Sequence, residues 1–164
     1  MADLTPPHTA IIGCGNPNRS DDGAGPCVIR ELRDRVLPEG VVLYDAGTDG
    51  MAVIYRARGV KRLILIDARQ PENAPGAIYE VPGEVLEAPP NQSLNLHDFR
   101  WDHALYAGRK IYGGDFPTDV TVFLIEAKTL DLGFELSEPV RVAVATVTNR
   151  IESLLQCSGG GIPA

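Results

Sequence analysis

The sequence contains few cysteines, and their arrangement excludes two common uses of this residue. Cys14, Cys27 and Cys157 are an odd number and form no CxxC pair. A disulfide framework and a cysteine-rich structural zinc site are therefore not expected. We interpret Cys14, which lies between two glycines, as a small buried residue, because a thiolate nucleophile needs a nearby base that the sequence does not supply.

Long apolar runs and an excess of positive charge are also missing. No apolar run approaches the roughly 18 residues of a membrane span, and the segment MADLTPPHTA lacks the charged and then apolar parts of a secretion signal. The 22 acidic residues outnumber the 15 basic ones, for a net charge of −7, which disfavours nucleic-acid binding. We expect a cytoplasmic monomer that binds neither membranes nor nucleic acid.

The pattern of apolar residues predicts an α/β fold. Apolar runs that end in glycine or aspartate alternate with segments of helical spacing, which is typical of a mostly parallel central sheet with helices on both faces. We expect a single three-layer domain over 1–164, with flexible tails at 1–8 and 158–164. Strands are predicted within 8–18 and at 41–47, 62–68, 76–83 (near an edge) and 119–127. Helices are predicted at 24–36, about 50–58, 101–113 and 137 to about 157, the last capped by Ser137.

Acidic side chains follow three of the predicted strands. In open α/β sheets, ligands bind beyond the carboxyl ends of the strands, so we expect these acids near a common cleft, where a metal ion would relieve their repulsion. Each acid also has a structural interpretation: Asp22 could cap the next helix, Asp67 could form a turn, and Asp45 could hold its turn through backbone N–H groups, which we favour. The acids are Asp21, Asp22, Asp45, Asp49 and Asp67.

Histidine and glycine leave further alternatives open. His97 precedes a predicted helix and could be a surface residue or a metal ligand, whereas His8 is expected far from the cleft. The Gly13-Cys14-Gly15 turn begins like a dinucleotide-binding motif, but Asn18 stands where that motif needs its third glycine. A Walker A sequence and a Gly-x-Ser-x-Gly elbow are absent. A dinucleotide-binding oxidoreductase therefore remains a weak alternative.

Four motifs in order resemble one family of enzymes. The segments GCGNPNRSDDGAG, YDAGTDG and LILIDA and the later histidine segment, between about residues 10 and 128, are similar to the hydrogenase maturation endopeptidases. The resemblance implies an aspartic-type peptidase that removes the C-terminal extension of a [NiFe]-hydrogenase large-subunit precursor after nickel insertion. The nickel comes with the substrate, and no organic cofactor is needed.

The resemblance also assigns roles to individual residues. Asp22, Asp67 and His97 are expected to contact the metal and to act in catalysis, with His103 as the alternative histidine. We expect Gly47 and Thr48 to contact the substrate. A non-catalytic chaperone that checks for nickel would keep the same residues and is the main alternative to a peptidase.

Overall fold

The computed structural model describes residues 7–83 and 101–158. Five strands form one sheet in the order β2-β1-β3-β5-β4, with all pairs parallel except β4 and β5. The strands are β1 (Thr9–Cys14), β2 (Val41–Gly47), β3 (Arg62–Arg69), β4 (Ile78–Pro82) and β5 (Asp119–Glu126). The helices are α1 (Ala24–Arg33), α2 (Gly50–Ala57), α3 (Trp101–Tyr112) and α4 (Glu138–Ser158), with short 3-10 turns η1 (Ser20–Gly23) and η4 (Gly113–Asp115).

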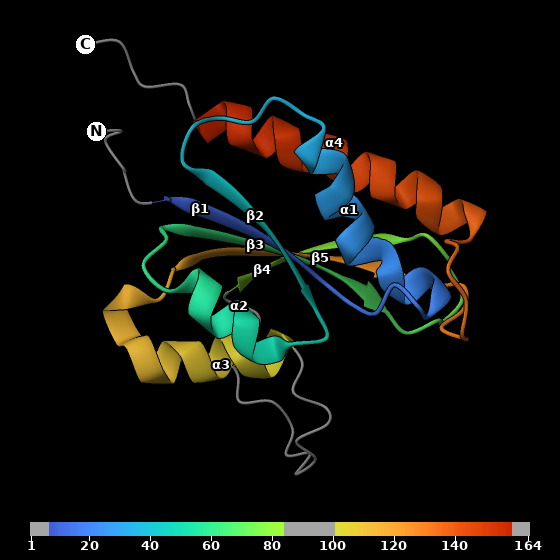
Figure 1. Ribbon diagram of the computed structural model, residues 1–164, viewed down its shortest axis with the longest axis horizontal. Coiled ribbons are helices and arrows are strands. Elements are labelled where there is room, and N and C mark those ends of the chain that lie inside the picture. Colours follow the sequence, from blue (N-terminus) through green and yellow to red (C-terminus); the bar gives the residue numbers. More distant parts are fainter. Residues whose placement is uncertain (1–6, 84–100, 159–164) are drawn as a thin grey trace.

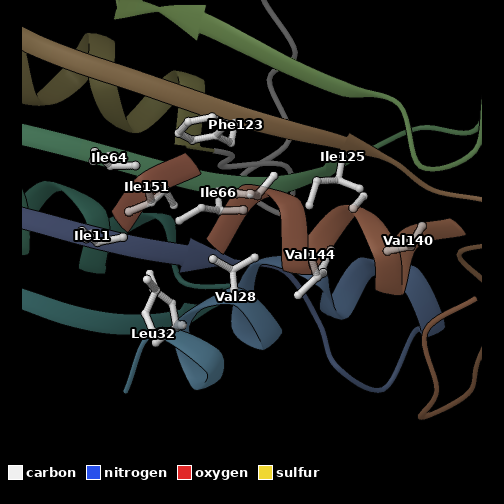
Figure 2. Packing of buried hydrophobic residues seen from close by; sticks show 14 of the residues in the cluster. Ile11, Val28, Leu32, Ile64, Ile66, Phe123, Ile125, Val140, Val144 and Ile151 are labelled. Carbon is white, nitrogen blue, oxygen red and sulfur yellow. The ribbon is translucent and has the colours of Figure 1, made fainter. Parts of the chain in front are cut away.

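Helices cover both faces of the sheet, so the predicted three-layer α/β class is confirmed. Helices α1 and α4 lie on one face, and α2 and α3 lie on the other (Figure 1). Side chains of β1 and β3 alternate between the two layers, as the pleat of a strand requires. Ile11, Ile64 and Ile66 pack toward α1 and α4 (Figure 2), whereas Ile12 and Leu65 pack toward α2 and α3.

The strand order creates one switch point in the sheet. The chain moves from β1 to β2 on one side and then to β3 on the other side of β1. The connecting loops diverge at this point, and open α/β sheets bind ligands beyond the carboxyl ends of the strands at such a switch point, here β1 and β3. We call this end of the sheet the carboxyl edge.

Two predicted boundaries were wrong. The helix predicted over 24–36 ends at Arg33, and Val36 is 95% exposed instead of belonging to the buried stripe. The N–H groups of Asp34 and Arg35 bond the carbonyls of Glu31 and Leu32, which tightens and closes the last turn. The strand predicted over 62–68 continues one residue further, because pairing with β5 extends to Arg69.

The structure also locates the predicted edge strand and His8. The strand predicted near an edge is β4, which closes the sheet beside β5. His8 lies before β1, at the opposite end from the carboxyl edge, where its ring contacts the carbonyl of Glu39 and the hydroxyl of Thr9. No helix within 7–83 and 101–158 is both long and apolar enough to cross a membrane. The predicted tails fall almost wholly outside these ranges and stay predictions.

Candidate active site

The turn after β1 folds back against the residues that precede α1. Gly15 adopts a φ of +128°, a conformation that residues with side chains rarely adopt. Its N–H donates to the carbonyl of Gly47 at 2.8 Å, and a Cβ at this position would collide with the backbone carbonyl of Asp22. Gly15 therefore lets the backbone of β1 touch that of η1.

Gly25, in the first turn of α1, lies directly on the ends of the two central strands. A Cβ added there would collide with the carbonyl of Cys14 and would lie 2.6 Å from the carbonyl of Ile66. Contact between these backbones brings η1, with Asp22, close to the point where β3 reaches Asp67. The glycines of the first motif thus serve close packing of α1 and η1 against the switch point.

Replacing Gly25 by alanine is expected to lower the free energy of unfolding by about 1–3 kcal/mol, the usual range for overpacking. Both colliding neighbours are backbone atoms of central strands, so this loss exceeds the gain of up to about 1 kcal/mol from removing a helical glycine. Urea denaturation followed by circular dichroism measures it. Gly114→Ala is the matched control, because a Cβ there meets nothing within 4 Å. Equal stability of the two variants would refute the packing role.

Asp22 is held by the turn and is not a helix cap. Its Oδ2 accepts the backbone N–H of Asn16 at 3.0 Å, and its side chain is partly exposed. The residue preceding α1 is Gly23, and no side chain caps that helix. The helix-cap interpretation of Asp22 was therefore wrong, and the hydrogen bond to Asn16 orients the carboxylate instead.

Asp67 lies where β3 separates from β1. Pairing of these strands ends at Gly13 and Ile66, because a shift in β1 moves Cys14 across to pair with Gly47. Asp67 still pairs with β5, so it is not a turn residue. Its half-buried carboxylate accepts the N–H of Ala68 at 2.8 Å. Asp67 is thus the first residue of β3 beyond its pairing with β1, at the carboxyl edge.

Cys14 lies near Asp67 and Asp45, and its thiol is not reactive. It packs in the hydrophobic cluster on the α2 and α3 side of the sheet, the face to which the alternation of β3 assigns Asp67. Burial, followed by the negative charges of Asp67 and Asp45, raises the pKa of the Cys14 thiol far above its ordinary value. The thiol stays protonated, which confirms its interpretation as a buried small residue.

Asp21 does not join the predicted cleft. Its side chain is fully buried and accepts four hydrogen bonds of 2.7–3.2 Å from the segment after β5. The donors are the N–H groups of Lys128, Thr129 and Ser137 and the hydroxyl of Ser137. Ser137 directly precedes α4, as predicted, and its hydroxyl is donated to Asp21. The expectation that Asp21 faces the common cleft is corrected: it binds a neighbouring loop.

The end of β2 supplies turn residues at the same edge. Asp45 accepts the N–H of Gly47 at 3.0 Å, which confirms its structural role. Asp49 accepts the N–H groups of Met51 and Ala52 and is the N-cap of α2, so it too was wrongly expected in the cleft. Gly47 contacts the Gly15 turn through its carbonyl, and Thr48 is exposed beside it; their predicted contact with substrate stays a prediction.

His97 lies outside the described residues, so its predicted role stays a prediction. The described chain resumes four residues later, at Trp101, with α3. Helix α3 leads into β5, which starts at the end of the sheet opposite the carboxyl edge, where Asp119 pairs with Arg62. The first turn of α3 therefore lies at the carboxyl edge. His103, the alternative ligand, is half-buried within α3 and already interacts with the protein.

One buried acid at this edge was missed by the sequence analysis. Glu126 ends β5 and is buried, and its Oε1 accepts the N–H groups of Glu72 and Ala74 at 2.9 and 2.7 Å. The N–H of Ala74 is the main cause that lowers the pKa of Glu126 below its ordinary value. An acid that ends an apolar strand was a visible signal, like Asp67. Glu126 holds the loop that follows β3.

The fold and the acids at its switch point define an α/β protein with a candidate site at the carboxyl edge of the sheet. The family model described as hydrogenase maturation protease matches residues 26–154. The hydrogenase 2 maturation protease of Escherichia coli is 26% identical over 91% of each chain. The solved structure of the hydrogenase maturating endopeptidase HybD from E. coli superposes with a TM-score of 0.80 at 25% identity, covering 93% of this chain and 94% of HybD.

The chain belongs to the hydrogenase maturation protease family, a family of endopeptidases, as the four sequence motifs predicted. The hydrogenase expression/formation protein HoxM of Azotobacter vinelandii is 30% identical over 84% of this chain. The chain spans 67%, 58% and 65% of the lengths of the first three curated relatives that it matches.

Proposed function

We propose that this protein is a nickel-dependent endopeptidase that removes the C-terminal extension of a [NiFe]-hydrogenase large-subunit precursor after nickel has been inserted. The observation that carries the proposal is the position of Asp22 and Asp67 at the carboxyl edge, where η1 contacts β3 and the pairing of β1 with β3 ends just before Asp67. The nickel belongs to the substrate, and the protein contacts it when the precursor docks. The cytoplasmic location and the monomeric state stay predictions of the sequence.

The donor chemistry fits a borderline divalent ion. Carboxylate oxygens bind most divalent ions, and imidazole nitrogen suits nickel. Within 7–83 and 101–158, no three acids, histidines or cysteines are grouped as a metal site. Asp22 and Asp67 lie in these ranges, and His97 does not. The proposed ligand set consists of these two acids with His97 as the third ligand. A set of three protein ligands leaves positions for the substrate's own ligands.

The arrangement explains how cleavage would depend on nickel. Without an ion, carboxylates brought together at this edge would repel each other and would offer nothing to hold the precursor. With nickel present in the precursor, both carboxylates gain a positive partner, and the scissile bond is held beside them. Cys14 is buried, and burial raises the pKa of its thiol, so the attacking group in this proposal is water.

Two routes would activate that water. A carboxylate of Asp22 or Asp67 would accept its proton as a general base, with nickel positioning the substrate. Alternatively, a nickel ion would polarise the scissile carbonyl and acidify the water. Asp22 is already oriented by the N–H of Asn16 through one oxygen, and this leaves its other oxygen for either task.

The geometry disfavours the dinucleotide alternative. In a dinucleotide-binding turn, backbone N–H groups point at the pyrophosphate. Here the N–H of Gly15 donates to Gly47, and the N–H of Asn16 donates to the carboxylate of Asp22. The negative side chain of Asp22 therefore occupies the side of the turn where a pyrophosphate would bind. Repulsion between the two is the physical reason why dinucleotide binding is the weaker alternative.

The deciding experiment compares nickel-loaded with nickel-free precursor. The purified protein is incubated with each form of a [NiFe]-hydrogenase large subunit, and intact-mass spectrometry records loss of the C-terminal peptide. We expect cleavage of the nickel-loaded form and at least about a hundredfold slower cleavage of the nickel-free form, because the protein ligands then have no metal ion to bind.

The other outcomes separate the alternatives. Equal cleavage of both forms would refute nickel dependence. Tight binding of the nickel-loaded precursor without any cleavage would identify the nickel-checking chaperone instead. Saturable binding of NAD or FAD to the purified protein, followed by fluorescence, would favour the oxidoreductase.

A further inference from the structure

The segment 128–137, which we call the β5–α4 loop, is fixed to the residues that carry Asp22. The fully buried carboxylate of Asp21 binds both ends of this loop, at Lys128 and Thr129 on one side and at Ser137 on the other. Figure 1 shows the loop beside the turn that precedes α1. The loop is therefore attached to Asp21, the residue next to the candidate catalytic acid Asp22.

The middle of the loop is fixed as well. Arg19 and Gly133 form a parallel bridge, with Ser20 N–H donating to the Gly133 carbonyl at 2.8 Å and Gly133 N–H donating to the Asn18 carbonyl at 3.0 Å. The Ser20 hydroxyl donates to the Asp131 carbonyl at 2.9 Å. These bonds hold the middle of the loop by its backbone, while the side chains on either side of Gly133 remain exposed.

This fixed loop presents two large apolar side chains to solvent. Leu132 is 87% exposed and Phe134 is 85% exposed. Single exposed apolar residues are common, but these two flank the tethered Gly133, so the backbone cannot fold them into the core. Asp131 and Glu135, both exposed acids, flank the pair. The result is a small apolar surface next to the candidate active site. Its border holds the two acids and also the guanidinium of Arg19, which donates to the carbonyl of Leu130.

We propose that Leu132 and Phe134 form the docking surface for the protein substrate, where they contact an apolar spot of the precursor that is bordered by basic side chains. This inference rests on the proposed function, because only a protein substrate must seat a folded surface while its tail reaches Asp22. The two acids of the border are complementary to basic residues on the partner. Because the loop is already ordered, docking loses little conformational entropy.

The test separates docking from chemistry. The double variant Leu132→Ser/Phe134→Ser is assayed with nickel-loaded precursor over a range of concentrations, beside the wild type. We expect KM to rise about tenfold or more, as for interface anchors, with kcat unchanged. The double variant Val36→Ser/Ile111→Ser is the control, because it removes side chains that are 95% and 64% exposed from the ends of α1 and α3 away from the carboxyl edge.

Each remaining outcome is informative. Wild-type protein that cleaves precursor, together with an unchanged KM in the Leu132/Phe134 variant or an equal rise in the control, would overturn the docking surface alone. A fall in kcat at constant KM would show that the loop acts through Asp22 and not by docking. A wild-type dimer that the loop variant disperses in sedimentation would make the occupant a second copy. Failure of the wild type to bind or cut precursor would overturn both proposals.

Discussion

Asp67→Asn is expected to slow cleavage of nickel-loaded precursor by a factor of about 10² to 10⁴, the range that positioned acid–base groups supply. Asparagine has nearly the same shape and keeps an oxygen for the N–H of Ala68, which now binds the Asp67 carboxylate at 2.8 Å. What it loses is the negative charge, which both routes to water activation require. Time courses by mass spectrometry at saturating precursor give the change in kcat.

A matched variant shows whether any lost charge at this edge has the same effect. Asp49 also accepts backbone N–H groups at the carboxyl edge, as the N-cap of α2, and asparagine caps helices as well as aspartate does. Asp49→Asn should therefore keep near wild-type activity. Unchanged thermal unfolding of Asp67→Asn would exclude a folding defect. Normal cleavage by Asp67→Asn would remove this residue from the proposed mechanism.

The layers of the fold were predictable because their signals are local. Buried parallel strands need continuous apolar runs, and 41–47, 62–68 and 119–127 are such runs in this sequence. Helix ends were less predictable, because Val36 fits the apolar spacing of α1 although the backbone turns away after Arg33. Spacing says which residues share a face, but it does not say where a last turn tightens.

The candidate site was predictable only in part, for the same reason. Acids at strand ends could be found in the sequence, and the resemblance selected Asp22 over Asp21. The actual partners of Asp21 lie more than 100 positions away in the chain, so no local pattern could reveal that this acid is structural. Glu126 was missed although it ends an apolar strand, because its partners belong to the loop after β3.

Substitution of the two adjacent acids should have different consequences: Asp21 mainly supports stability, and Asp22 mainly supports cleavage. The loss of stability at Asp21 is the second large effect that we expect. Asp21→Ala leaves three N–H groups of the β5–α4 loop without the buried carboxylate that accepts them. Hydrogen bonds to a charged group are worth about 1.5–3 kcal/mol each, so we expect a loss of several kcal/mol, a large fraction of the stability of an ordinary domain. Asp22→Ala removes one hydrogen bond of a partly exposed side chain, worth about 1 kcal/mol.

Urea denaturation measures both losses, and hydrogen exchange locates them. In Asp21→Ala the amides of Lys128, Thr129 and Ser137 should lose protection, whereas in Asp22→Ala they should keep it. If Asp21→Ala does not fold, Asp21→Asn, which retains one acceptor oxygen, should give an intermediate loss of stability. Asp22→Ala should lose only about 1 kcal/mol of stability but should lose cleavage. A larger stability loss in Asp22→Ala than in Asp21→Ala would contradict this division, because the side chain with four hydrogen bonds would then support the fold less than the side chain with one.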